Sequence, residues 1–92
     1  MALMMSRKKS GKNELAFKDE WTNKNTISGL TQGHHYYFFI TGGSFTNVTQ
    51  VHNVNTGGTF VIEGYPTSGG TVTCTTNMSI FDTDDIEISG LW

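Results

Sequence analysis

The chain has 92 residues, with six Lys and Arg, eight Asp and Glu, and a formal net charge of −2. This length allows one small domain, and the only cysteine, Cys74, excludes an intramolecular disulfide. No Lys or Arg follows Lys24, so the body of the chain is a poor candidate for nucleic-acid binding, which depends mostly on those residues.

The first residues predict a flexible basic arm over 1–13, followed by a single β domain over 14–92. The arm contains the basic stretch SRKKSGK, and short charged termini of this kind are usually solvated. The apolar run MALMM is too short to span a bilayer or to act as a secretory signal. We expect a protein made in a bacterial cytoplasm, without a signal peptide or membrane insertion.

The remainder predicts an all-β fold, a small antiparallel β-sandwich or jelly roll of about 6–8 strands. Short β-branched and aromatic segments alternate with runs rich in Thr, Asn, Ser and Gly. The extended segments expected in chain order are 13–21 (a strand or a short helix), 26–30, 34–41, 45–54, 59–65, 71–81 and 86–92. Within 45–54, valines spaced by three break the alternation of a strand and predict a bulge or a bend near Gln50.

The segment 71–81 has the clearest alternation. One face is expected to carry Val72, Cys74, Met78 and Ile80, and the other face carries Thr, Asn and Ser. A buried Cys74 thiol is unreactive. Because the Ser and Thr residues also lack a G-x-S-x-G motif or a base partner, we expect a protein that is not an enzyme.

The run HHYYFFIT at 34–41 is apolar on both faces of the expected strand. Each aromatic side chain buries about 150–250 Å², so an open second face would expose on the order of 300–500 Å², near the limit for a soluble surface. We expect that second face to be covered by the N-terminal segment or by another copy of the chain. The candidate interface residues are His35, Tyr37, Phe39, Phe17 and Trp21.

Charge patterning favours the second copy. Lysine on an edge strand is a common guard against edge-to-edge pairing, and none follows Lys24. We expect a homo-oligomer, with a trimer as the candidate form, and the alternative is a monomer with short, twisted edges.

Three stretches carry a family resemblance: EWTNKN (20–25), TISGLTQGHHYYFFIT (26–41) and IEISGLW (86–92). They resemble the small β-sandwich domains that end bacteriophage tail-fibre and minor structural proteins. The resemblance implies a virion-associated structural or receptor-binding module with other virion proteins as partners. The spacing of Leu30, Gly33 and Tyr36 also looks like the tyrosine corner of fibronectin type III domains, but that fold needs two or three strands before Leu30.

Metal-ligating residues are few, and no cofactor is predicted. His34 and His52, on neighbouring strands, are the candidate ligands, whereas His34 and His35 face opposite ways and cannot hold one ion together. The stretch DTDDIE (82–87) has carboxylates that suit calcium, although Asp-rich turns also arise for backbone hydrogen bonding.

Carbohydrate binding is the alternative function. Tyr65 and Trp92 are candidate stacking platforms, and Asn53 and Asn55 are candidate hydrogen-bonding residues. The sequence thus leaves three hypotheses open. The first is a non-enzymatic bacteriophage virion component for structure or attachment, acting as a homo-oligomer. The second is a monomeric module that recognises a host cell-surface glycan, and the third is a small phage-encoded inhibitor of a host protein.

Overall fold

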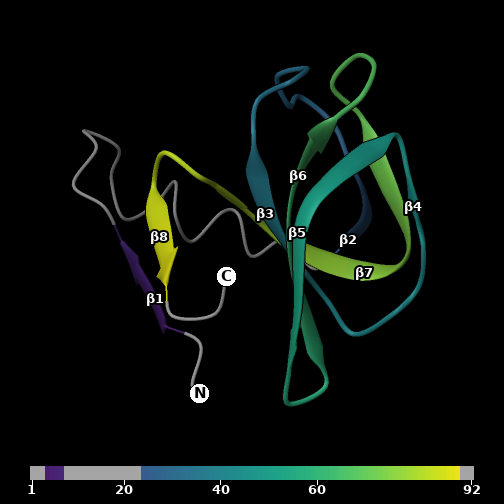
Figure 1. Ribbon diagram of the computed structural model, residues 1–92. Helices are drawn as coiled ribbons and strands as arrows, with labels where there is room; N and C mark the ends of the chain where they lie inside the picture. The colour runs from purple at the N-terminus through teal and green to yellow at the C-terminus, as the bar shows by residue number, and fades with distance from the viewer. Residues whose placement is uncertain (1–3, 8–23, 90–92) are drawn as a thin grey trace.

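The computed structural model describes residues 4–7 and 24–89, and every element of secondary structure in them is a β-strand (Figure 1). The strands are β1 (Met4–Arg7), β2 (Lys24–Ile27), β3 (Tyr36–Ile40), β4 (Phe45–Thr46), β5 (Val48–Thr56), β6 (Thr59–Pro66), β7 (Val72–Asp82) and β8 (Ile86–Ser89). The all-β prediction is therefore confirmed. The part of the chain that the structure describes contains no helix long and apolar enough to cross a membrane.

Six strands form one antiparallel sheet in the order β2-β7-β3-β6-β5, and the short β4 also pairs with β7. The long β7 pairs with β2 between Val72 and Met78, with β4 at Thr73 and Cys74, and with β3 through Ser79–Asp82. Figure 1 shows β7 curving along this length. The strands are thus joined in a single curved sheet, and the expected sandwich of two facing sheets is not confirmed.

A separate two-stranded sheet pairs β1 with β8, from Met4 opposite Ser89 to Arg7 opposite Ile86. β1 lies inside the segment that the sequence predicts to be a flexible arm. The rest of that segment, and the expected element at 13–21, lie outside the described residues.

The main core lies on one face of the six-stranded sheet, here called the inner face. Its buried residues are Tyr36, Phe38, Ile40, Ile62, Val72, Cys74, Met78 and Ile80. Ile27 from β2 and Val48 from β5 pack against this same cluster. Because β2 and β5 are the two edges of the sheet, the sheet must curve around its inner face. The alternation predicted for β7, including the burial of Cys74, is confirmed.

The opposite, outer face carries a second buried cluster. Val61 and Phe81 are fully buried there, and the half-buried Tyr37 and Phe39 pack against them. The rings of Phe39 and Phe81 meet edge to face with centroids 5.3 Å apart. The second face of β3 is therefore largely closed within one chain. The placement of Phe17 and Trp21 lies outside the described residues.

Asn47 divides the segment 45–54, which the sequence predicts as one strand, into β4 and β5. Its backbone has a φ of 68°, a conformation that Asn tolerates better than most residues. Its side-chain amide donates to the carbonyl oxygens of Ser68 and Thr71, and its Oδ1 accepts from the Ser68 N–H at 2.8 Å. The chain therefore changes partner at Asn47, with β4 pairing to β7 and β5 pairing to β6.

β5 contains the predicted bulge. Gln50 pairs with Gly64 and His52 with Glu63, so Val51 is an extra residue that has no counterpart on β6. The hairpin between β5 and β6 closes through Gly57 and Gly58, with φ values of 59° and 88°, as a two-residue turn with positive φ requires.

Candidate functional site

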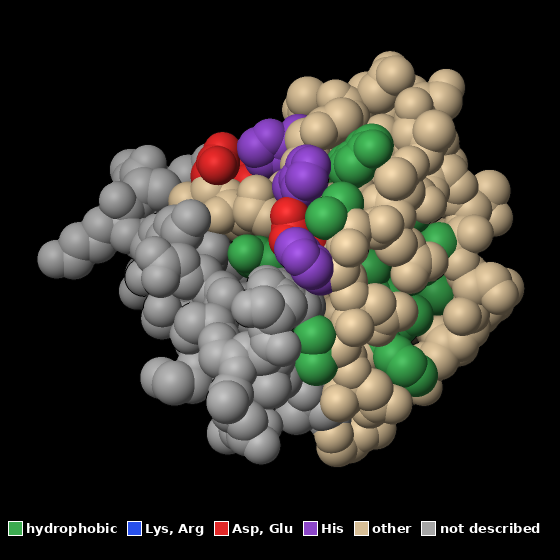
Figure 2. Space-filling model, viewed as in Figure 1, with side chains coloured by type: hydrophobic (Ala, Val, Ile, Leu, Met, Phe, Trp, Pro, Cys, Tyr) green, Lys and Arg blue, Asp and Glu red, His purple; other side chains and the backbone are tan. Residues whose placement is uncertain are grey.

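The chain enters β3 through two adjacent histidines whose partners lie on different strands. The Nε2 atom of His34 donates to Oδ1 of Asp82 at 2.7 Å and lies 3.7 Å from Oδ2 of Asp84. His35 instead donates from Nδ1 to Oε2 of Glu63 at 2.6 Å. This divergence is the one that strand geometry predicts for neighbouring residues. Figure 2 shows histidine and acidic side chains gathered on one part of the viewed face.

Glu63 joins two histidines. It lies on β6 opposite Tyr37 of β3, and its second oxygen, Oε1, accepts from Nδ1 of His52 on β5 at 2.9 Å. The ring of Tyr65 stacks on that of His35 with centroids 5.1 Å apart and an interplanar angle of 22°. We call His35, Glu63 and His52 the glutamate clamp, because Glu63 ties together the residue before β3 and two strands of the sheet.

The clamp changes the acidity of its carboxylate. Partial burial alone would raise the pKa of Glu63, but the hydrogen bonds and positive charge of His35 and His52 outweigh it and lower that pKa below its ordinary value of 4.5. Glu63 is therefore ionised in the native state at neutral pH, with both carboxylate oxygens engaged. This arrangement fixes three segments of backbone against one another.

The other cluster has the composition of a metal site. Among the described residues, only His34, Asp82 and Asp84 bring three ligand atoms within 4.8 Å of one another. His52, predicted together with His34 as a metal ligand, lies in the glutamate clamp instead. Of the predicted calcium-binding stretch, Asp82 and Asp84 lie in this cluster, while the side chains of 86–87 lie outside the described residues.

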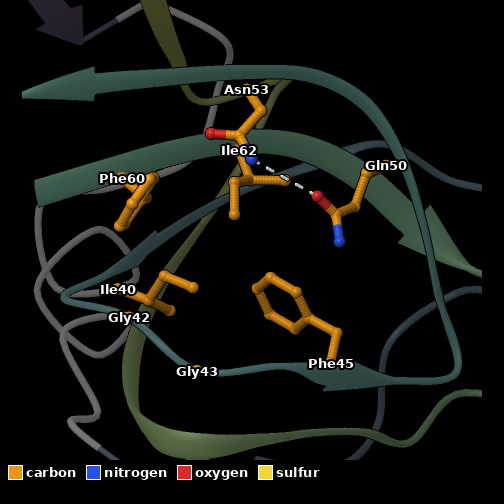
Figure 3. A pocket seen from close by; sticks show the side chains of 8 residues that line it. All are labelled: Ile40, Gly42, Gly43, Phe45, Gln50, Asn53, Phe60 and Ile62. Atoms are coloured by element: carbon orange, nitrogen blue, oxygen red, sulfur yellow. Dashed lines mark hydrogen bonds between the residues drawn. The ribbon is translucent and has the colours of Figure 1, made fainter.

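A pocket of about 270 Å³ opens between β4, β5 and β6 (Figure 3). Ile40, Phe45, Phe60 and Ile62 give it an apolar lining, and Gln50 and Asn53 place their amides beside it. Asn53 Nδ2 donates to Gln50 Oε1 at 3.5 Å. Because no charged side chain lines the pocket, its chemistry suits a small neutral ligand with an apolar surface and hydrogen-bonding groups.

Of the predicted carbohydrate-binding residues, only Asn53 lines this pocket. Tyr65 stacks on His35, and Oδ1 of Asn55 accepts a hydrogen bond from the Gly58 N–H in the hairpin turn at 3.2 Å. Trp92 lies outside the described residues. Tyr37 and Phe39, predicted at an oligomer interface, are half-buried in the single chain, so their burial does not require a partner, and their place in an interface remains a prediction.

Sequence reasoning missed the glutamate clamp and three pocket residues, Phe45, Gln50 and Phe60. The clamp and the pocket both depend on which strands are neighbours and on the register of their pairing. A single sequence shows neither the strand order nor the register. The bulge near Gln50 was the one available signal, because a bulge changes which face the following residues occupy.

No family model, curated protein or solved structure matches this chain. The resemblance to bacteriophage tail-fibre domains therefore depends on the sequence motifs alone.

Proposed function

We propose that the protein is a non-enzymatic structural or attachment component of a bacteriophage particle that acts through homo-oligomeric assembly. The particle context comes from the sequence resemblance. The observation that supports homo-oligomeric assembly is the length and composition of the edge strand β5.

β5 is the longest of the sheet's edge strands and the best candidate for accepting another strand. It has nine residues, and within the described part of the chain it pairs only with β6. It contains no Lys or Arg, and its Val51 is the large hydrophobic residue with the greatest exposure in the described chain, at 45%. The opposite edge, β2, has four residues and carries Lys24. A long edge strand without Lys or Arg can add a strand from another chain. The proposed occupant here is β5 of a second copy, which would pair on either side of the bulge at Val51.

The test is the mass in solution, measured by light scattering coupled to size exclusion. The wild-type protein should have a mass of two or more chains, and Val51→Lys should shift it toward the single-chain mass of 10.2 kDa, because the new charge would be desolvated between paired edges. Asn25→Lys, on the exposed edge β2, is the matched control and should leave the mass unchanged. A wild-type protein that is a single chain at all concentrations would overturn the proposal.

A second candidate function is recognition of a cell-surface glycan, favoured by the pocket between β4, β5 and β6. The apolar face of a sugar ring can stack on Phe45 or Phe60. The amides of Gln50 and Asn53 can form hydrogen bonds with the sugar hydroxyls. On a glycan array, Asn53→Ala should abolish a signal that Asn55→Ala retains, since Asn55 lies outside the pocket. The absence of any signal from the wild-type protein would exclude this function.

A further inference from the structure

His34, Asp82 and Asp84 form a compact set of ligand atoms where β7 ends. Nε2 of His34 lies 2.7 Å from Asp82 Oδ1 and 3.7 Å from Asp84 Oδ2. In a tetrahedral zinc site, with bonds of about 2.0–2.1 Å, neighbouring ligand atoms lie roughly 3.3 Å apart. The two distances from Nε2 bracket that spacing, and all three ligand atoms lie within 4.8 Å of one another, so one ion can be placed among them after small side-chain shifts.

Backbone and side-chain hydrogen bonds already hold this set in place. The Thr83 hydroxyl donates to the carbonyl oxygen of His35 at 2.9 Å, which ties the turn after β7 to the residue that follows His34. Within the turn, the Asp84 N–H donates to Asp82 Oδ1 at 2.8 Å and the Asp85 N–H to the Asp82 carbonyl at 3.0 Å. The ligand atoms are thus brought together from two distant parts of the sequence without the help of an ion.

The His34 ring has a further support. It meets the ring of Tyr36 edge to face, with centroids 5.0 Å apart, and the Tyr36 hydroxyl accepts from the Thr31 N–H at 2.9 Å. Such contacts fix the orientation of a ligating imidazole and reduce the ordering that binding would require.

The donor atoms select the kind of ion. Calcium and magnesium favour shells made entirely of oxygen, whereas one imidazole nitrogen with two carboxylate oxygens suits zinc. We infer that His34, Asp82 and Asp84 bind one zinc-like divalent ion. The ion takes the position of the hydrogen between Nε2 and Oδ1, and the neutral ring of His34 then carries its single proton on Nδ1, which faces away from the ion. Asp84 is 68% exposed, so water can occupy the fourth position.

The glutamate clamp provides an internal comparison. It has two histidines and one carboxylate, but its three ligand atoms do not all lie within 4.8 Å of one another, as those of His34, Asp82 and Asp84 do. Each of its imidazoles donates to a different oxygen of Glu63. A histidine removed from the clamp should therefore leave the ion in place.

The experiment is a titration of the full chain with zinc by calorimetry, and with cobalt by visible absorption. The wild-type protein should bind one ion per chain, and the cobalt spectrum should be that of a four-coordinate site with nitrogen and oxygen ligands. His34→Gln and Asp84→Asn should each weaken binding at least about tenfold, and His52→Gln should not change it. Circular dichroism of each variant without metal verifies folding, and if His34→Gln does not fold, the exposed Asp84→Asn decides alone.

Two results would overturn the inference. One is a folded wild-type protein that binds neither ion at a hundredfold excess. The other is His52→Gln weakening binding as much as Asp84→Asn does, which would place the ion elsewhere. Neither result bears on the proposed assembly, which does not depend on a metal.

Discussion

The two faces of β3 are built from similar residues but are held in different ways. On the inner face, Tyr36, Phe38 and Ile40 are at most 7% exposed and pack against β6 and β7. On the outer face, Tyr37 and Phe39 are half-buried. The charged glutamate clamp lies on the same face, because Glu63 is opposite Tyr37. Apolar packing depends on close fit, whereas a charged hydrogen bond depends on ionisation. The inner face should therefore respond to lost volume and the outer face to pH.

The largest difference between the faces is expected for adjacent phenylalanines. Phe38 is fully buried, so Phe38→Ala should lower the free energy of unfolding by about 3–5 kcal/mol. Phe39→Ala removes a half-buried ring that contacts Phe81 and should cost roughly half as much. Urea denaturation measures both values. Equal losses would show that the two faces contribute equally to the core.

A smaller effect should follow from crowding the sheet where β5, β6 and β3 run side by side. Gly64 pairs with Gln50 and Tyr36, and a Cβ at this position would lie 2.6 Å from the backbone oxygen of Thr49. Gly64→Ala should therefore destabilise the fold by about 1–3 kcal/mol.

The test compares the stability of Gly64→Ala with that of Val51→Ala, using circular dichroism to monitor thermal unfolding. The control changes an exposed position on β5 and should stay within about 0.5 kcal/mol of wild type. If Gly64→Ala were equally neutral, β5 and β6 would be able to move apart at this point without loss.

The smallest expected effect is the pH dependence of the outer face. The lowered pKa of Glu63 means that the folded protein favours the ionised carboxylate. The resulting stability is fully present above the ordinary pKa of 4.5 and is lost as the pH falls through the lower folded value. Glu63→Gln should cost about 1 kcal/mol at neutral pH.

The pH test is the difference in unfolding free energy between wild type and Glu63→Gln, measured from pH 7 downward. That difference should shrink below pH 4.5, the ordinary pKa of this carboxyl group. A difference that stays constant across the range would mean that the clamp does not favour ionised Glu63.

The sequence was sufficient where structure is local. The alternation in 71–81 identified the inner face of β7, and the spacing of three valines located the bulge in β5. It was not sufficient at Asn47, whose side chain bonds to Ser68 and Thr71. The split between β4 and β5 depends on that contact, which joins residues more than twenty positions apart.

The candidate sites follow the same rule. Three histidines were identified as notable, but the sequence does not reveal which of their partners they meet. Glu63 and Asp82 lie on strands whose order and register a single sequence does not show, and Asp84 lies in the turn after β7. The same limit explains why Asn53 was selected without its neighbour Gln50 in the pocket.

The bulge at Val51 decides which face of the sheet its two neighbours occupy. Gln50 faces the pocket and His52 reaches Glu63 on the outer face, although residues two apart on a regular strand share one face. Without position 51, Gln50 and His52 would be consecutive on a regular strand and would still lie opposite Gly64 and Glu63. Loss of this one residue should therefore keep the pocket and the glutamate clamp in place, whereas a one-residue slip of β5 elsewhere would turn the residues beyond it to the opposite face.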